Sequence, residues 1–135
     1  MAHWLLKSEP FKYSWTKFNA DKRTHWDGVR NYQAANNLKA MKVGDQAFFY
    51  HSNEGLEIVG IAEIVREAYP DPSDASGRFV MVDVAPVKPV PNPVTLKAMK
   101  AAPALKDLAL IRQSRLSVVP ISDTEWAELC RMGGL

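Results

Sequence analysis

The chain is organised around a stretch that begins with Thr24-His-Trp-Asp-Gly-Val-Arg-Asn-Tyr-Gln33 and ends with Ala47-Phe-Phe-Tyr-His-Ser52. The first part places an indole, a glycine turn, a guanidinium and a side-chain amide between Trp26 and Asn31. The second part is typical of a strand that is buried on both faces and turns polar at its end. Aromatic surface flanked by hydrogen-bonding groups is what a pocket for a flat polar ligand requires, although the same residues would equally serve a hydrophobic core.

Apolar runs on both sides of this stretch predict five short strands. They cover residues 3–7, 46–51, 56–65, 78–87 and 116–119. The spacing of apolar residues, together with capping side chains, predicts short helices between and after the strands. They cover residues 14–19, 31–41, 95–100 and 105–110, with a last helix that starts at Ser122 and ends at Gly133.

Turn-forming residues separate these elements. Trp26–Gly28 is predicted to be a turn, Tyr69–Gly77 a loop, and Pro86–Pro93 an irregular stiff connection, because proline cannot donate to a strand ladder. Gly60, in the middle of a strand, indicates a bulge or a bend. Five strands with interspersed small helices predict a mixed α+β fold around a small, bent or closed sheet. Because no linker or repeat divides the chain, we expect a single domain over residues 1–135.

The totals are average for a soluble globular protein. A length of 135 residues is enough to bury one core without disulfides, and the single cysteine, Cys130, excludes an internal disulfide and a cysteine-based zinc site. No secretory or membrane-spanning segment is recognisable, so we expect a cytoplasmic protein with no membrane partner.

Charge is distributed unevenly along the chain, although the net charge is only +2. Residues 1–42 hold eight Lys or Arg against three acidic side chains, and residues 88–115 hold six against one. Residues 54–76 reverse this, with six acidic side chains against one Arg. If the two basic segments lie together, they would form a basic face opposite an acidic one, as a nucleic-acid-binding protein requires.

Motifs for cofactors, metals and catalysis are missing or weak. The sequence has no phosphate loop, no dinucleotide fingerprint and no metal-ligand spacing around its three histidines, so we expect neither a cofactor nor a metal. A nucleophile–base pair could be drawn from Ser8 or Ser52 with His51, oriented by Asp83. Neighbouring residues on a strand point to opposite faces, which argues against His51 and Ser52 meeting directly.

The stronger constellation is one for binding. Trp26, Tyr50 and Tyr32 offer aromatic faces on which a base could stack. Polar side chains that could contact a base edge are Ser8, Asn31, His51 and Ser52, and guanidinium groups that could contact phosphate are Arg30, Arg112 and Arg115.

Five motifs in succession carry a family resemblance. They are Lys7-Ser-Glu-Pro10, Trp26-Asp-Gly-Val-Arg-Asn-Tyr32, Phe48-Phe-Tyr-His-Ser52, Glu67-Ala-Tyr-Pro-Asp71 and Arg112-Gln-Ser-Arg-Leu-Ser117. In this order, over residues 3–132, the chain resembles the EVE domain family, in a compact prokaryotic form that stands alone. The resemblance implies a PUA-like fold, which is a small bent β-barrel of about five to six strands with short peripheral helices. It also implies a pocket for a modified base such as 5-methylcytosine.

Carried over by motif, the resemblance implies roles for particular residues. The pocket wall would be Trp26 and Tyr50, and the polar contacts would be Ser8, Asn31, His51 and Ser52. The pocket rim or phosphate contacts would be Lys7, Arg30, Arg112 and Gln113.

We therefore expect a non-enzymatic, monomeric module that reads a modified base in nucleic acid, with DNA favoured over RNA. Two alternatives stay open from the sequence. One is an RNA-binding accessory domain that recognises structured RNA, and the other is a nucleotide- or nucleoside-processing enzyme that uses His51 as acid or base.

Overall fold

The computed structural model describes residues 2–135. In this range the strands are β1 (His3–Ser8), β2 (Thr24–Trp26), β3 (Gln46–His51), β4 (Glu57–Pro70), β5 (Val80–Thr95) and β6 (Val118–Ile121). The helices are α1 (Trp15–Asp21), α2 (Tyr32–Ala40), α3 (Leu96–Ala101), α4 (Ala109–Arg112) and α5 (Asp123–Met132), with a 3-10 turn at Pro103–Leu105.

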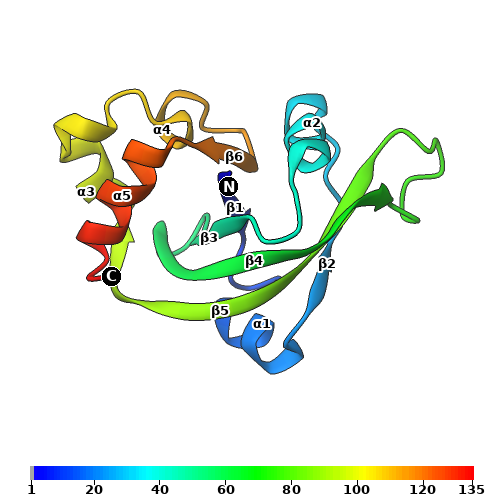
Figure 1. Cartoon of the computed structure of the whole chain (residues 1–135), viewed down its shortest axis with the longest axis horizontal. Helices are drawn as coiled ribbons and strands as arrows, with labels where there is room; N and C mark the ends of the chain where they lie inside the picture. Colours follow the sequence, from blue (N-terminus) through cyan, green and yellow to red (C-terminus); the bar gives the residue numbers. More distant parts are fainter. Residues whose placement is uncertain (1) are drawn as a thin grey trace.

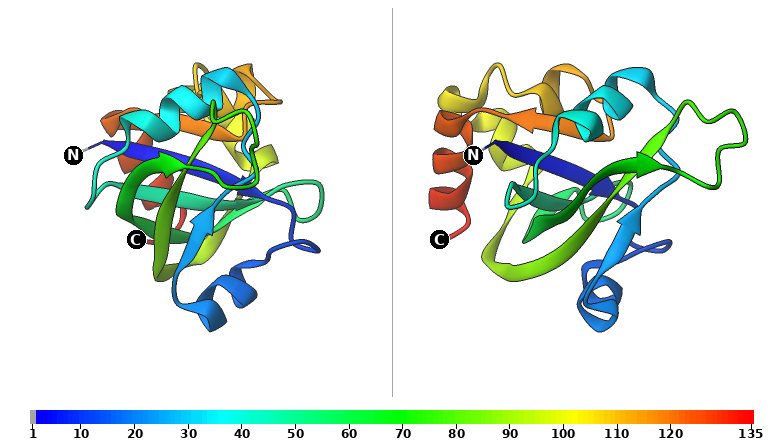
Figure 2. Two further views of the ribbon diagram at one scale, coloured as in Figure 1. Left: turned by 90° about the vertical axis from the view of Figure 1, so that its right-hand side faces the viewer. Right: turned by 45° about the vertical axis from the view of Figure 1, so that its right-hand side comes forward.

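All six strands belong to one sheet, in the order β2-β5-β4-β3-β1-β6. The β1–β3 pair is parallel and the other neighbours are antiparallel. Figures 1 and 2 show that β4 and β5 are long and strongly curved, so the sheet wraps around its own core. Within the described residues the two edge strands, β2 and β6, do not pair with each other, so the barrel stays open. The predicted mixed α+β fold with one bent sheet is confirmed.

The helices lie around the sheet in three groups. Helices α3, α4 and α5 gather at one end of the molecule, α2 covers β5 and β6, and α1 lies against β5 on another side (Figure 1). The tip of the β4–β5 hairpin extends from the opposite end. None of the helices in residues 2–135 is long and apolar enough to cross a membrane.

Side-chain caps fix where the helices begin. Ser14, Asn31 and Thr95 each accept a hydrogen bond from the backbone N–H three residues later. Ser122 and Glu125 form a complete capping box at the start of α5. These caps satisfy N–H groups that have no partner inside the helix, and they confirm four predicted helix starts.

Gly60 lies at the bend that its position in the sequence predicts. The β3–β4 register shifts between Phe49 and Tyr50, and the β4–β5 register shifts between Ile58 and Gly60. A Cβ atom at Gly60 would lie 2.3 Å from the indole of Trp15. Glycine is therefore required here because α1 inserts its first side chain against the bent strand.

The prediction for Pro86–Pro93 is wrong, because β5 runs through all of these prolines to Thr95. Strand β2 pairs with β5 only at Val82–Val84, so beyond that point one edge of β5 is free. Proline is tolerated in such a strand, where its missing N–H faces no partner strand, and the register shifts opposite Gly60 and Ala62 absorb the remaining mismatch.

Several boundaries also differ from the predictions. Trp26 ends a short strand, β2, instead of starting a turn, and Gly28 follows with a positive φ of 76°. Strand β4 continues to Pro70, well past residue 65, and β6 covers Val118–Ile121, so it extends past Pro120 and beyond the predicted end at residue 119. The helix predicted over 105–110 is replaced by the 3-10 turn and α4.

Candidate functional site

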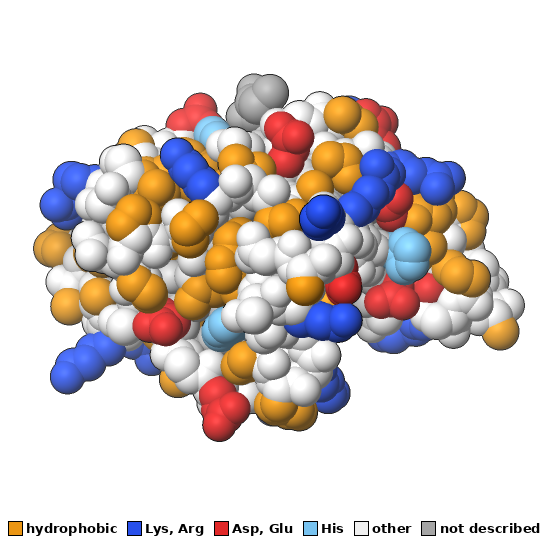
Figure 3. Space-filling model, turned by 90° about the horizontal axis from the view of Figure 1, so that it is seen from below, with side chains coloured by type: hydrophobic (Ala, Val, Ile, Leu, Met, Phe, Trp, Pro, Cys, Tyr) orange, Lys and Arg blue, Asp and Glu red, His pale blue; other side chains and the backbone are white. Residues whose placement is uncertain are grey.

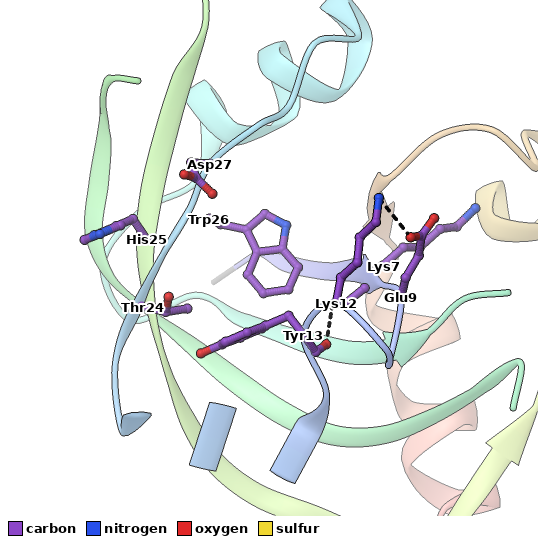
Figure 4. Close-up of a pocket in the computed structure, with 9 residues that line it drawn as sticks. Lys7, Glu9, Lys12, Tyr13, Thr24, His25, Trp26 and Asp27 are labelled. Atoms are coloured by element: carbon purple, nitrogen blue, oxygen red, sulfur yellow. Dashed lines mark hydrogen bonds and ion pairs between the residues drawn. The ribbon is translucent and has the colours of Figure 1, made fainter. Parts of the chain in front are cut away.

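A cavity of about 310 Å³ opens beside Trp26, between the end of β1, the segment that follows it, and β2. It is lined by Lys7, Ser8, Glu9, Lys12, Tyr13, Thr24, His25, Trp26 and Asp27. Figure 4 shows the indole of Trp26 between Tyr13 on one side and the Lys12–Glu9 pair on another. We call this space the Trp26 cavity.

Two aromatic side chains form the apolar wall of the Trp26 cavity. Trp26 is only 9% exposed, because its ring packs edge-on against Phe49 with a centroid distance of 5.7 Å. Tyr13 lies 6.4 Å from Trp26 at an interplanar angle of 77°. The Ser8 hydroxyl donates to the Tyr13 carbonyl at 2.5 Å, so the end of β1 fixes where Tyr13 lies. Burial raises the pKa of the Tyr13 hydroxyl above its ordinary value.

Charges of both signs surround the cavity. Lys7 is half-buried, and burial lowers the pKa of its ammonium group, which donates to the Ser114 carbonyl at 2.8 Å. Lys12 lies 3.2 Å from Glu9 Oε2. On the face of the molecule drawn in Figure 3, basic and acidic side chains are likewise interspersed.

The segment after Trp26 is held by a buried carboxylate from the β4–β5 loop. Asp71 accepts hydrogen bonds from the Gly28 N–H at 2.9 Å and from the Arg30 guanidinium at 3.2 Å. It also accepts from the N–H and hydroxyl of Ser73, at 2.8 and 2.6 Å. Burial alone would raise the pKa of Asp71, but the hydrogen bonds from Ser73, Gly28 and Arg30 lower it to about 2.

This contact bears on two expectations. Arg30, predicted as a rim or phosphate contact, is ion-paired with Asp71 and lies 5.5 Å from the centre of the Phe79 ring, while 41% of its side chain stays exposed. The phosphate contact of Arg30 stays a prediction. Asp71 belongs to the acidic segment 54–76, which therefore does not lie wholly opposite the basic segments. The expected separation into one basic and one acidic face is therefore wrong where Asp71 contacts Arg30.

A second cavity of about 300 Å³ lies between the start of α2 and the segment after α4. It is lined by Asn31, Gln33, Arg112, Gln113, Ser114, Arg115 and Leu116. Lys7 lines the Trp26 cavity and bonds to Ser114, which lines this second one, so Lys7 connects the two. Part of the Arg112 guanidinium is engaged by the Lys106 carbonyl and by Asp107.

The predicted site residues are therefore divided among three places. Lys7, Ser8 and Trp26 line the Trp26 cavity, and Asn31, Arg112 and Gln113 line the second one. Tyr50 is 2% exposed and lies in the core, and neither His51 nor Ser52 lines either cavity. The Asn31 amide oxygen caps α2, accepting from the Ala34 N–H at 2.9 Å.

His51 lies against the start of α1. Its Nε2 accepts a hydrogen bond from the Trp15 N–H at 3.1 Å, so in the neutral ring the proton is on Nδ1. Burial lowers the pKa of His51, and the nearby charge of Glu57 opposes this in part. His51 therefore holds the start of α1 as an acceptor.

The catalytic arrangement considered from the sequence is not present. The Ser8 hydroxyl donates to a carbonyl, and Asp83 is bonded to Tyr69 at 2.5 Å and Arg23 at 3.0 Å instead of to His51. Within residues 2–135, no three His, Cys, Asp or Glu side chains are grouped so as to hold a metal ion.

Sequence reasoning overlooked six residues that line the Trp26 cavity, namely Glu9, Lys12, Tyr13, Thr24, His25 and Asp27. Glu9 and Asp27 lie inside the motifs quoted above, so the motifs could have indicated them. Tyr13 lies in the segment after Pro10, and the sequence does not indicate that this segment lies beside β2 in the folded chain.

Comparisons with known proteins place the chain in a family. Residues 2–132 match the model of the EVE domain. Thymocyte nuclear protein 1 of Gallus gallus is 39% identical over 92% of this chain, and the match covers 65% of that protein. The chain thus spans about two thirds of this curated relative's length.

Solved structures of similar sequence have the same fold as this chain. Rpa0253 from Rhodopseudomonas palustris is 57% identical, with a TM-score of 0.94 over 99% of this chain and 94% of that one. Human THYN1 protein in complex with DNA containing 5-methylcytosine is 35% identical, with a TM-score of 0.92 over 100% of this chain and 99% of that one. The chain therefore belongs to the EVE domain family.

Proposed function

We propose that this protein binds nucleic acid that carries a modified base, with 5-methylcytosine in DNA as the favoured ligand, and that the base enters the Trp26 cavity. The observation that carries the proposal is a cavity walled by Trp26 and Tyr13 in a chain that aligns over its full length with a human relative in complex with 5-methylcytosine DNA. A cavity of about 310 Å³ is within the range that small ligands use.

The cavity wall suits a flat base. Aromatic side chains give each base a sequence-tolerant stacking surface worth about 1–3 kcal/mol. Trp26 is fixed by Phe49, and Tyr13 by the Ser8 hydroxyl, so little conformational freedom would be lost when a base binds. Because the indole is mostly buried and Tyr13 meets it edge to face, Trp26 and Tyr13 would form two adjoining walls against which a base lies.

The strand that carries the base would extend towards the second cavity. Lys7 connects the two cavities, and Arg115 and Gln113 line the second one with exposed side chains. Guanidinium and amide groups are common phosphate and sugar contacts. In this proposal Asn31 and Arg112 belong to the strand-binding surface, while Tyr50, His51 and Ser52 support the wall from behind.

The proposed role is binding without turnover. His51 Nε2 is occupied by the Trp15 N–H, and Asp83 is bonded to Tyr69 and Arg23, so neither is free to act on a ligand in the Trp26 cavity. The reader role therefore agrees with the hydrogen bonds of these side chains better than the enzyme alternative does.

Binding of Trp26→Ala to a 5-methylcytosine oligonucleotide tests the proposal. Loss of the indole wall should weaken binding about tenfold or more, as expected for a stacking contact of about 1–3 kcal/mol. Running DNA and RNA versions of one sequence side by side separates the DNA reader from the RNA-binding alternative. Chemical change of the oligonucleotide that disappears in His51→Gln would support the enzyme instead.

Trp15→Ala is the matched control, because Trp15 packs on the same Phe49 ring at 5.4 Å yet does not line the cavity. Both variants remove an indole from the core, so both should lower stability, but only Trp26→Ala should weaken binding at a temperature where both are folded. Equal affinity losses in the two variants would contradict a base-binding role for the Trp26 cavity.

A further inference from the structure

Tyr32 is an exposed aromatic residue that lines neither cavity. It is the first residue of α2, and it is 62% exposed. Among the aromatic residues of the described chain, only Phe11 is more exposed, at 67%. Single exposed apolar side chains are common on protein surfaces, so exposure alone assigns Tyr32 no role. The groups that surround the ring do.

The Tyr32 ring is supported on one side by the end of the β4–β5 loop. The Phe79 ring is 8% exposed and lies 5.2 Å from the Tyr32 ring at an interplanar angle of 33°. Arg78 Nη1 donates to the Tyr32 hydroxyl at 3.4 Å. Arg78 and Phe79 are themselves fixed, because their N–H groups donate to the Asp74 carboxylate at 2.9 and 2.8 Å. Tyr32 is thus held in place while most of its surface stays open to solvent.

Positive charge borders this ring. Arg78 is exposed, and no carboxylate in residues 2–135 lies within ion-pair distance of its guanidinium. Arg30 also contacts Phe79, with its guanidinium 5.5 Å from the ring centre, and keeps 41% of its side chain exposed beside its ion pair with Asp71. An aromatic face bordered by guanidinium groups is how many proteins bind a single strand of nucleic acid. We call Arg30, Tyr32, Arg78 and Phe79 the Tyr32 platform.

The Tyr32 platform adjoins the site already described. Asn31 and Gln33, the neighbours of Tyr32 in the chain, both line the second cavity. Figures 1 and 2 show the start of α2 beside the β4–β5 loop, where Tyr32 meets Phe79. Asp27 lines the Trp26 cavity, and the chain from Asp27 to Tyr32 spans at most about 18 Å. One strand can therefore reach both places.

We propose that Tyr32 stacks on the base of a nucleotide that flanks the modified one, and that Arg78 contacts the phosphate of that nucleotide. The inference rests on the proposed function, because a base in the Trp26 cavity fixes where the strand begins its path across the surface. Every base has an aromatic face, so this contact raises affinity without selecting a sequence or a modification. The Trp26 cavity would then decide which base is bound, and the Tyr32 platform would hold the strand.

An abasic scan tests the stacking contact. A single-stranded DNA with one 5-methylcytosine is made in versions that each lack one flanking base, and binding is followed by fluorescence anisotropy. We expect one flanking position at which loss of the base weakens wild-type binding about fivefold or more. Tyr32→Leu keeps an apolar side chain on Phe79 but has no aromatic face, so the same loss should have little effect in this variant.

A second readout separates Tyr32 from the Trp26 cavity. Tyr32→Leu should weaken binding of 5-methylcytosine and cytosine oligonucleotides by the same factor, so the ratio of their dissociation constants should stay at the wild-type value. A 2-aminopurine at the sensitive flanking position should lose fluorescence when the wild-type protein binds, because stacking quenches it. This measurement needs no variant.

Salt dependence tests the phosphate contact. Arg78→Gln should reduce the slope of log affinity against log salt by about 0.7, the value for one phosphate contact on a single strand. Lys97→Gln is the matched control, because it removes one exposed charge from α3, at the end of the molecule opposite the β4–β5 loop (Figure 1). The control should leave the slope unchanged.

The outcomes distinguish this inference from the proposed function. A wild-type protein with no sensitive flanking position, or equal sensitivity in Tyr32→Leu, would overturn the role of Tyr32 and leave the proposed function in place. Coupling of the flanking base to Phe11→Leu instead would assign the contact to the turn after β1 and overturn the inference as well. Equal wild-type affinity for 5-methylcytosine and cytosine, with the coupling to Tyr32 intact, would overturn modified-base reading but support the strand contact at Tyr32. Failure to bind any of these oligonucleotides would overturn both.

Discussion

Replacement of Asp71 by Ala should separate the segment after Trp26 from the β4–β5 loop. The Asp71 carboxylate is the acceptor for the Gly28 N–H, the Arg30 guanidinium and Ser73, and its side chain is fully buried. Hydrogen bonds to a charged group contribute about 1.5–3 kcal/mol each and are not additive, and removing one member of a buried pair costs about 3–5 kcal/mol. Since Arg30 is partly exposed, we expect a loss of about 3 kcal/mol.

This loss corresponds to a measurable change in melting temperature. An unfolding entropy of about 2.1 cal/mol/K per residue gives about 0.28 kcal/mol/K for 135 residues. Asp71→Ala should therefore lower the Tm by about 10 °C in calorimetry. Hydrogen exchange at the Gly28 amide should accelerate more than at amides of the core strands, because its acceptor is gone.

Asp74→Ala is the control for this experiment. The pKa of Asp74 is also about 2, chiefly because of the hydrogen bonds from Ser76 and the Phe79 N–H, but these bonds lie within the β4–β5 loop. This variant should leave the Gly28 amide protected. A Tm decrease of less than about 3 °C in Asp71→Ala, with unchanged exchange at Gly28, would refute the idea that Asp71 holds the cavity segment in place.

Two further predictions concern the bend and the histidine behind it. Gly60→Ala should lower the free energy of unfolding by about 1–3 kcal/mol in denaturant titrations, because the new methyl group would overlap the Trp15 indole. The loss should be smaller in a Trp15→Leu background, where the indole is absent. Equal losses in both backgrounds would exclude this steric cause. The pKa of His51 is lowered from 6.5 on folding, so the unfolded chain binds its proton more readily, and stability should fall as the pH drops below about 6.5. Comparing the free energy of unfolding at pH 7.5 and 5.5 should give a smaller difference in His51→Gln than in the wild type, and identical differences would show that His51 does not contribute.

Local signals account for the parts of the fold that were predictable from the sequence. Helix caps such as Ser14 and Ser122 depend only on the capping side chain and the next three residues, so the local sequence is enough to predict where these helices begin. Gly60 was identified as a bend because a glycine within an apolar run weakens a strand and often marks a bulge. The sequence could not reveal that Trp15 is the group that fills the space at Gly60, since this contact joins segments 45 residues apart.

The errors have a common physical cause, which is that partners distant in sequence override local preference. The prolines of β5 argue against a strand, but the free edge beyond Val84 tolerates them. The basic segment that holds Arg30 was expected to lie opposite the acidic segment, but Asp71 reaches Arg30 from the β4–β5 loop.

For the candidate site, motif membership identified the Trp26 cavity but not its whole lining. Ser8 and Trp26 were found because they lie in recognisable motifs, whereas Tyr13 reaches the cavity through the turn after Pro10. Tyr50 and His51 lie in an equally distinctive motif, yet the strand that carries them is buried, so they face the core and α1. A motif thus indicates which segments meet, and only the fold decides which side chains line the cavity.

The central claim is that a 5-methylcytosine base lies against the aromatic walls of the Trp26 cavity, and the methyl group of the base is the most direct reporter of it. An oligonucleotide with a ¹³C-labelled 5-methyl group can be titrated with the protein and followed by NMR. If the base lies beside Trp26 and Tyr13, ring currents should shift the methyl signal upfield on binding, and this shift should be lost in Trp26→Ala. Binding that leaves the methyl signal unshifted, or that shifts it equally in Trp26→Ala, would contradict the claim.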